Sequence, residues 1–339
     1  MNHRTLGSVG EVSEVGYGSW QIGSDWGDVS ESEAVAAVET ARDAGIDFFD
    51  TADVYGDGRS EQILGDVLGD DIARGDVTVA TKAGRRLDPH VADGYTEANL
   101  RRFVNRSREN LGVETLDLVQ LHCPPTDVYY RPETFDALAT LADEGRIAAY
   151  GVSVERVEEG LKAIEYPGVE SVQIIFNPFR QRPAELFLDE AAARDVGVIC
   201  RVPLASGLLT GALSRDDEFP ENDHRNYNRD GDAFDVGETF AGVPFEAGLD
   251  AADALADRVD AVADDPTDAT GDDLSLAGFS LRWILDHDAV SAVIPGSTTP
   301  EHIRSNAAVS DRPPLGDDAH EAAREVYDEF VREHVHHRW

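Results

Sequence analysis

Apolar residues follow two alternating patterns along the chain. Short runs rich in β-branched residues predict strands, and longer stretches with apolar positions three or four residues apart predict helices between them. The predicted strands occupy residues 15–19, 46–51, 77–82, 116–122, 147–152, 171–176, 198–202 and 290–294. The clearest predicted helices occupy residues 33–44, 60–68, 97–111, 132–144 and 184–194.

Eight such strand–helix repeats favour a closed (β/α)8 TIM barrel, a single α/β domain over residues 1–339. The competing architecture is an open doubly wound sheet, which carries Gly-x-Gly-x-x-Gly after a strand when it binds a dinucleotide. The Gly-x-Gly segments at residues 16–18 and 56–58 both lack the third glycine. The pattern therefore predicts the barrel, and any dinucleotide would have to bind in another way.

Three segments interrupt the rhythm of strands and helices. The segment at about 212–242, after the seventh strand, is rich in Asp, Asn, Gly and Arg, and two interpretations stay open: a lid over the barrel mouth or a disordered insertion. The Asp-rich residues 263–273 predict a solvated linker. The tail with His334, His336 and His337 predicts a frayed, exposed terminus rather than a metal site, and no metal is expected.

The charge balance argues against two classes of binding partner. The chain has 29 basic and 67 acidic residues, a net charge of −38, which repels nucleic acid and anionic lipid. No run of eighteen apolar residues and no apolar leader is present, and Cys123 and Cys200 are expected to be buried free thiols. We therefore expect a cytoplasmic protein that binds neither membranes nor nucleic acid.

The acidic composition also suggests a cytoplasm of high salt concentration. Lys82 and Lys162 are the only lysines, and the other basic residues are arginines. A folded, acidic and lysine-poor chain resembles proteins of salt-accumulating halophilic archaea. At about 1 M salt the screening length falls to roughly 3 Å, which removes most of the repulsion between surface carboxylates.

Four chemically active side chains stand where predicted strands end: Asp50, Tyr55, Lys82 and His122. The carboxyl ends of barrel strands carry the active sites of TIM-barrel enzymes. Each residue alone has a structural interpretation, as a turn cap, an interface aromatic or a core histidine. Lys82 is harder to explain as a structural residue, because nearly all other basic residues of the chain are arginines. Lysine can lose its proton when it is buried, whereas arginine cannot.

The segments around these residues resemble the aldo-keto reductase superfamily. The likeness covers residues 3 to 310 and is carried by GIDFFDTADVYGDGRSE at 45–61, LDLVQLH at 116–122 and PLASGLLTG at 203–211, the first being the most specific. It implies a barrel whose amino end is closed by a β-hairpin, here residues 4–18, with a further helix at the carboxyl end. It also implies that Asp50, Tyr55, Lys82 and His122 form the catalytic tetrad.

The resemblance gives each residue a role in carbonyl reduction. Tyr55 would donate a proton to the carbonyl oxygen, and Lys82 would lower the pKa of its phenol. Asp50 would orient Lys82 and keep it charged. His122 would hydrogen-bond the substrate oxygen, and Trp20 would join Tyr55 and His122 around the substrate.

The resemblance further implies a nicotinamide cofactor, NADP or else NAD. Ser153 and Gln173 would hold the carboxamide, Arg201 would stack on the ring, and the segment from Pro203 to Gly207 would follow the pyrophosphate. The expected cofactor-binding residues are Ser153, Gln173, Arg201, Pro203, Leu204, Gly207, Ser297, Thr299, His302 and Asn306. The family's basic clamp for the 2′-phosphate is replaced here by Gly296 and His302, so discrimination between the two cofactors is expected to be weak.

The expected function is NAD(P)H-dependent reduction of aldehydes or ketones, or oxidation of the corresponding alcohols or sugars. The substrate is a small carbonyl compound or alcohol, and the oligomeric state stays open. Two alternatives remain: a Schiff-base aldolase with Lys82 as nucleophile, and a non-catalytic regulatory subunit that binds the nicotinamide.

Overall fold

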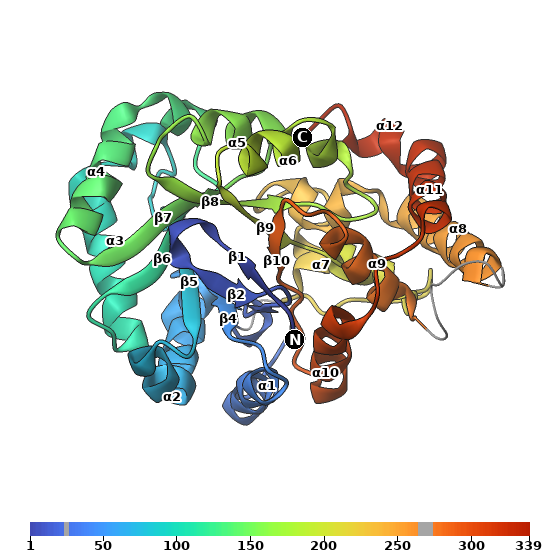
Figure 1. Cartoon of the computed structure of the whole chain (residues 1–339), viewed down its shortest axis with the longest axis horizontal. Helices are drawn as coiled ribbons and strands as arrows, with labels where there is room; N and C mark the ends of the chain where they lie inside the picture. Colours follow the sequence, from blue (N-terminus) through green and yellow to red (C-terminus); the bar gives the residue numbers. More distant parts are fainter. Residues whose placement is uncertain (24–26, 264–273) are drawn as a thin grey trace.

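The computed structural model describes residues 1–23, 27–263 and 274–339. Eight parallel strands follow one another in chain order around a sheet. They are β3 (Tyr17–Gly18), β4 (Phe48–Asp50), β5 (Thr78–Ala83), β6 (Leu116–His122), β7 (Ile147–Ser153), β8 (Val169–Ile175), β9 (Gly197–Arg201) and β10 (Val290–Val293). A parallel bridge between Val15 and Val293 joins the first strand to the last, so the predicted (β/α)8 barrel is confirmed (Figure 1).

Helices surround the strands on the outside (Figure 1). They are α1 (Glu31–Asp43), α2 (Arg59–Arg74), α3 (Glu97–Leu111), α4 (Pro132–Asp143), α5 (Val157–Ala163), α6 (Phe187–Ala192), α7 (His224–Tyr227), α8 (Phe245–Ala263), α9 (Leu276–Leu285), α10 (Pro300–Ala308), α11 (Asp317–Val326) and α12 (Arg332–Val335). The helix predicted at 184–194 is shorter, because a 3₁₀ turn that includes Pro183 ends in a non-helical residue, Leu186, with φ of −151°.

The inside of the barrel is apolar at its amino end. Side chains alternate across a strand, so one residue of each pair points inward. The inward residues at this level form one buried cluster: Phe48, Ala80, Leu118, Ala149, Ile199 and Ala292, together with Leu6 and Val12. The last two come from the antiparallel hairpin of β1 (His3–Thr5) and β2 (Glu11–Ser13), which closes this end as predicted. Gly197 allows the close approach, because a Cβ there would lie 2.4 Å from Cδ1 of Leu6.

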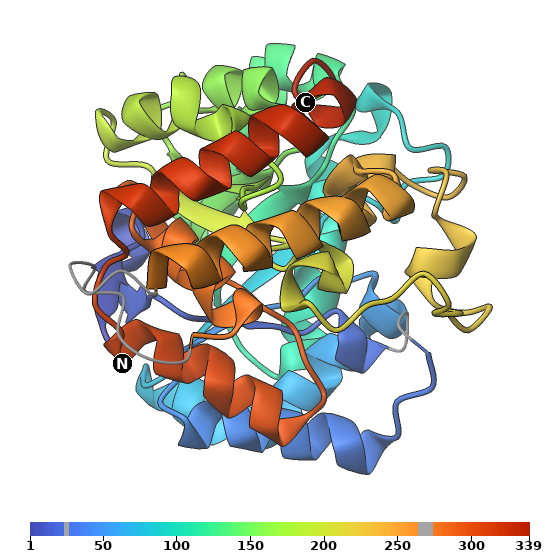
Figure 2. The same cartoon turned by 90° about the vertical axis from the view of Figure 1, so that its right-hand side faces the viewer.

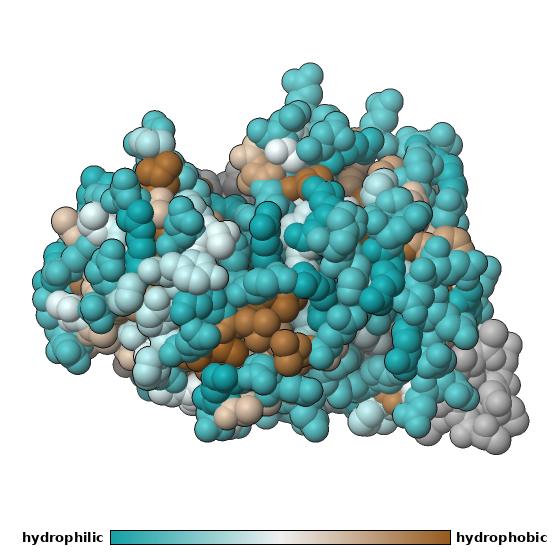
Figure 3. All heavy atoms as spheres, turned by 90° about the horizontal axis from the view of Figure 1, so that it is seen from above, coloured by the Kyte–Doolittle hydropathy of each residue, from teal (hydrophilic) through white to brown (hydrophobic). Residues whose placement is uncertain are grey.

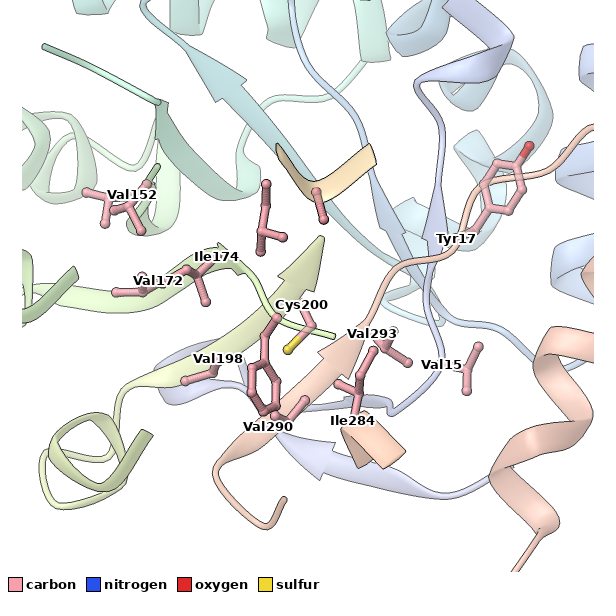
Figure 4. Close-up of a cluster of buried hydrophobic side chains, with 14 of the residues drawn as sticks. Val15, Tyr17, Val152, Val172, Ile174, Val198, Cys200, Ile284, Val290 and Val293 are labelled. Carbon is pink, nitrogen blue, oxygen red and sulfur yellow. The ribbon is translucent and has the colours of Figure 1, made fainter. Parts of the chain in front are cut away.

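The outward-facing residues of the same strands pack against the helices. Figure 4 shows part of this second, larger cluster, with Val172, Val198 and Val293 on neighbouring strands and Ile284 of α9 beside them. Cys123 and Cys200 are both buried and free, as predicted. Most of the molecular face in Figure 3 is hydrophilic, and its hydrophobic atoms gather mainly near the middle.

The carboxyl-terminal tail is folded, and the prediction of a frayed, exposed end is wrong. Trp339 is buried, its Nε1 donates to Oδ1 of Asp235 at 2.9 Å, and its ring covers the guanidinium of Arg180 at 3.9 Å. Burial of the aromatic ring outweighs the freedom that a terminus gains in solvent. Earlier in the chain, α11 lies beside α8 (Figure 2), where Arg258 of α8 pairs with Glu325 of α11 and with Glu329 in the turn after it.

The segment after β9 is packed against the barrel through residues that include Asp223, Asn228 and Glu238, which are buried, so it is not a disordered insertion. The Asp-rich linker predicted at 263–273 lies, beyond its first residue, outside the described residues. Within the described part of the chain, no helix is long and apolar enough to cross a membrane.

Candidate active site

A polar layer lies above the apolar layer, toward the carboxyl ends of the strands. The alternation that turns Phe48 inward also turns Asp50 inward, two residues later. The same step leads from Ala80 to Lys82 on β5. The buried polar residues at this level are Asp50, Lys82, Gln120, His122, Ser153, Gln173 and Arg201. Strand geometry alone therefore gathers side chains from six strands in one place.

Asp50 and Lys82 form a buried ion pair. The Lys82 ammonium donates to Oδ1 of Asp50 and to the carbonyl oxygen of Thr51 at 2.9 Å. The other Asp50 oxygen accepts from Nε2 of Gln173 at 2.7 Å and from Nε2 of Gln120 at 3.3 Å. Burial lowers the pKa of Lys82, and the Asp50 carboxylate opposes that shift. Hydrogen bonds to both oxygens fix the carboxylate, which in turn fixes the ammonium.

Tyr55 stands in the turn after β4, where its hydroxyl oxygen lies 3.4 Å from Nζ of Lys82. Its ring stacks on Trp20 with centroids 6.0 Å apart and meets His122 edge-on at 5.9 Å. Burial raises the pKa of Tyr55 well above its ordinary value of 10.0, and Asp50 adds to the rise. Burial sets the net direction of this pKa, and the expectation that Lys82 lowers it stays a prediction. At neutral pH the phenol keeps the proton that a donor needs.

His122 is a neutral imidazole at neutral pH. Burial lowers its pKa well below the ordinary 6.5, and the positive charges of Arg85 and Lys82 lower it further. Its Nδ1 is buried without a hydrogen-bond partner among the described residues. The ring can therefore offer a hydrogen bond without carrying a charge.

A cavity of about 520 Å³ opens onto these residues. Its lining includes Asp50, Tyr55, His122 and Trp20, whereas Lys82 is not a lining residue. Nine of the ten predicted cofactor-binding residues also line it: Ser153, Gln173, Arg201, Pro203, Leu204, Gly207, Ser297, His302 and Asn306. Thr299, the residue before α10, does not. The structure thus unites residues from the strand ends and from the segments after β9 and β10.

Two charged residues of the described lining were not predicted, Glu238 and Arg225, both from the segment after β9. Glu238 is buried, binds Nη2 of Arg85 at 2.5 Å and lies 3.7 Å from Nη1 of Arg201. Burial alone would raise the pKa of Glu238, but the two guanidiniums outweigh it and lower the pKa. Nothing in the sequence marks either residue, because the segment has no periodicity and many charges.

Comparison with known proteins identifies the family. Residues 14–328 match the model of the aldo/keto reductase family. The chain belongs to that family. It is 29% identical to the uncharacterized oxidoreductase YqkF of Bacillus subtilis over 90% of both chains. Membership makes this reductase an NAD(P)-dependent oxidoreductase.

Solved structures agree with the barrel. The glycerol dehydrogenase AKR11B4 from Gluconobacter oxydans superposes with a TM-score of 0.75 and 27% identity, over 98% of this chain and 96% of its own. An aldo/keto reductase from Klebsiella pneumoniae, solved with NADP and acetate, has a TM-score of 0.69 and 21% identity over 96% of this chain and 95% of its own. The second likeness concerns the fold alone.

The side chains of the reductase fit the nicotinamide carboxamide, which needs both a donor and an acceptor. The hydroxyl of Ser153 lies 3.5 Å from Oε1 of Gln173, while the Gln173 amide nitrogen is held by Asp50. Ser153 can thus donate to a carboxamide oxygen, and Oε1 of Gln173 can accept from its nitrogen. Arg201 could add a hydrogen bond to the cofactor, since its buried Nε has no hydrogen-bond partner among the described residues. A cavity of this volume is in the usual range for cofactor sites.

Proposed function

We propose that this reductase converts aldehydes or ketones to alcohols, or runs the reverse oxidation, with Tyr55 as the group that transfers the proton. The nicotinamide cofactor supplies or accepts the hydride. The observation that carries the proposal is the phenol of Tyr55 in the cavity wall, with the Lys82 ammonium 3.4 Å behind it. A protonated phenol beside a fixed positive charge can give up its proton to a carbonyl oxygen and remain as a stabilised phenolate.

Lys82 and Asp50 would assist Tyr55 without contacting the substrate. As the phenol loses its proton, negative charge develops on its oxygen, and the Lys82 ammonium is placed to stabilise it. Asp50 orients that ammonium through the buried ion pair. An arginine would present a broad planar group and not the compact charge that this buried position accommodates.

His122 and Trp20 would position the substrate. Because burial holds the pKa of His122 well below 6.5, the ring can donate one hydrogen bond to the carbonyl oxygen without competing as an acid. Trp20, stacked on the Tyr55 ring, forms an apolar wall beside it.

We further propose that NADP is preferred over NAD, with weak discrimination. The first part is what the resemblance to the family implies. The second part rests on Gly296 and His302, which line the cavity where the family places its basic clamp. Ser297, Thr299 and the amino end of α10 would then contribute to phosphate binding.

The alternative of a Schiff-base aldolase is disfavoured by the position of Lys82. The ammonium is buried, paired with Asp50 and absent from the cavity lining, so a substrate carbonyl does not reach it. The test is turnover of NADPH and NADH with a panel of aldehydes, ketones and polyols, together with borohydride trapping. We expect cofactor turnover and no adduct on Lys82. An adduct on Lys82 would support the aldolase, and cofactor binding without turnover would support a regulatory subunit.

The reductase is also proposed to act in a high-salt cytoplasm. Its net charge of −38 supports this, and so do Arg101 and Arg258, each of which pairs with two surface carboxylates. Circular dichroism and activity should be retained in molar KCl and fall as salt is removed, because carboxylate repulsion is then unscreened. Full cooperative folding and activity in dilute buffer would contradict the proposal.

A further inference from the structure

Glu238 is a carboxylate in the cavity wall that the proposed tetrad does not use. It ends the 3₁₀ turn Val236–Glu238 in the segment after β9, and its side chain is buried. Packing fixes this turn, because the Asp235 carboxylate accepts hydrogen bonds from the amide of Gly237 at 2.7 Å and from Nε1 of Trp339 at 2.9 Å. The backbone that carries Glu238 is therefore held firmly at the cavity wall.

The two carboxylate oxygens of Glu238 have different surroundings. Oε1 accepts a hydrogen bond from Nη2 of Arg85 at 2.5 Å. Oε2 lies 3.7 Å from Nη1 of Arg201, beyond hydrogen-bond distance, and accepts no hydrogen bond from the described part of the chain. It is not sealed from solvent, in contrast to the carboxylate oxygens of Asp53. Because Glu238 lines the cavity, this oxygen is available to a ligand there.

Glu238 is ionised at neutral pH. Burial alone would raise its pKa, but the positive charges of Arg85 and Arg201 outweigh burial and lower the pKa. An ionised carboxylate accepts hydrogen bonds and donates none. The ligand group that suits Oε2 is therefore a neutral donor such as a hydroxyl, whereas a second carboxylate at the same place would be repelled.

The pair of Arg85 and Glu238 stands beside the proposed proton donor. Burial raises the pKa of Tyr55 most, and the charge of Glu238 adds to the rise while that of Arg85 opposes it. After burial, the charge of Arg85 is also the strongest influence that lowers the pKa of His122. Charges with these effects act at close range, so the pair belongs to the surroundings of the reacting carbonyl.

A continuous row of contacts joins Tyr55 to Glu238. The Tyr55 ring stacks on Trp20 at 6.0 Å, and Trp20 meets the ring of Phe234 at 5.9 Å. The guanidinium carbon of Arg85 lies 5.8 Å from the Phe234 ring, and Arg85 in turn binds Glu238. The wall beside the phenol thus begins with aromatic rings and ends in a charged pair, which suits a substrate with both a carbon skeleton and a polar substituent.

We propose that Glu238 is a specificity-determining residue, whose Oε2 accepts a hydrogen bond from a hydroxyl on the carbon next to the substrate carbonyl. This inference rests on the proposed function, because it needs a carbonyl bound at Tyr55 and His122. A hydroxyl satisfies the carboxylate, an alkyl group leaves it desolvated and unpaired, and a carboxylate meets it with like charge. The enzyme therefore selects neutral α-hydroxy aldehydes and ketones, or in reverse the corresponding vicinal diols, over alkyl and 2-oxo acid analogues.

The test uses substrates that differ only in the group attached to the carbonyl carbon. Hydroxyacetone, 2-butanone and pyruvate carry a hydroxymethyl, an ethyl and a carboxylate group on the same methyl ketone. Glycolaldehyde, propanal and glyoxylate form the matching aldehyde series. In molar KCl with NADPH, kcat/KM should fall in the order hydroxymethyl, ethyl, carboxylate. Because the three groups also differ in intrinsic reactivity, the decisive quantity is the change in their ratios on substitution.

Glu238→Gln removes the charge and keeps the shape. Arg85 then needs the amide oxygen, so an NH₂ group takes the place of Oε2. The preference for hydroxyacetone over 2-butanone should fall about tenfold, the scale for one charge-assisted hydrogen bond, and pyruvate should gain about tenfold on 2-butanone. The dissociation constant for NADPH should stay within about twofold. The matched control is Glu155→Gln, because Glu155 lies 3.6 Å from the same guanidinium but outside the cavity lining, and it should leave both ratios unchanged.

The contrary results are distinct. Unchanged ratios in Glu238→Gln overturn the inference, and so does an equal change in Glu155→Gln. Weaker NADPH binding with unchanged ratios assigns Glu238 to the cofactor and contradicts a role in substrate selection.

The unmutated chain covers the case in which Glu238→Gln does not fold. Faster reduction of pyruvate or 2-butanone than of hydroxyacetone contradicts the inference without any substitution, and so does the same order among the aldehydes. A chain that reduces other carbonyl compounds but neither series contradicts this inference alone. A chain that turns over no aldehyde, ketone or polyol overturns the proposed function itself.

Discussion

The two walls of the cavity are built in different ways. One wall is the strand ends, where Asp50 and His122 line the cavity and Lys82 lies behind Asp50; the three residues are on adjacent strands and almost fully buried. The other wall is the segments after β9 and β10, where Arg225 of α7 is half-buried and His302 of α10 is exposed. Asp50 and Lys82 of the first wall bind each other across two strands, while Arg225 is held by its own segment.

This difference suggests a division of labour. Proton transfer depends on the distance between reacting groups, so it needs side chains fixed by a rigid sheet. Cofactor affinity is a sum of many contacts, so its charges can come from different segments in different relatives. We therefore expect substitutions in the strand-end wall to reduce turnover and substitutions in the other wall to alter binding.

The largest effect is expected for Tyr55→Phe. Removal of the hydroxyl takes away the proton donor, and turnover should fall by about 10²-fold or more. Steady-state rates at saturating cofactor measure this change. The control is Tyr130→Phe, because Tyr130 is 67% exposed and lies outside the cavity lining; its turnover should not change. Near-normal turnover in Tyr55→Phe would place the chemistry elsewhere.

A somewhat smaller loss is expected for Lys82→Arg. The guanidinium keeps the charge but does not fit the buried site of the ammonium between Asp50 and Thr51, so turnover should fall by about tenfold to 10²-fold. Lys162→Arg is the matched control, since Lys162 lies on the surface beside Glu165. If both substitutions leave turnover intact, Lys82 acts only as a structural cation.

A smaller and different effect is expected in the second wall. His302→Arg restores a permanent charge where the family has its clamp and should favour NADPH over NADH by about tenfold, at the lower end for one charge-assisted contact. The ratio of kcat/KM for the two cofactors measures it, with kcat nearly unchanged. A ratio that already favours NADPH several hundred-fold before substitution would contradict the assignment of the phosphate site.

The smallest effect is expected from pH. The depressed pKa of His122 keeps the ring neutral above its ordinary 6.5, and the raised pKa of Tyr55 keeps the phenol protonated below 10.0. Turnover should thus change less than about threefold between pH 6 and 8. Burial raises the pKa of Asp53 and of Glu155 to about 7, but neither lines the cavity. A large step near neutral pH that disappears in His122→Asn would contradict the neutral imidazole.

Much of the first wall could be predicted from the sequence. Strand periodicity located all eight strands, because alternation and β-branched runs are local signals. The motif around Asp50 and Tyr55 and the isolated Lys82 indicated the residues that the structure gathers. The direction of the Tyr55 pKa could not be predicted, since it depends on burial, which a motif does not reveal.

The second wall could be predicted only in part. The contact between Arg85 and Glu238 joins residues 153 positions apart, and that between Asp235 and Trp339 joins residues 104 positions apart. Neither pair stands in a periodic pattern, so long-range packing alone determines them. For the same reason the tail was expected to be exposed, although Trp339 is buried.

The central claim is that the group at the strand ends, with Tyr55 as proton donor, carries out proton transfer and that this role is separable from cofactor affinity. Its most direct test is to titrate Tyr55→Phe and the unmutated chain with NADPH in molar KCl and to measure binding by the quenching of protein fluorescence. The account predicts the same dissociation constant for both, within about twofold, while Tyr55→Phe has lost nearly all turnover. A Tyr55→Phe variant that no longer binds NADPH would contradict it, because the loss of turnover would then be a loss of the cofactor.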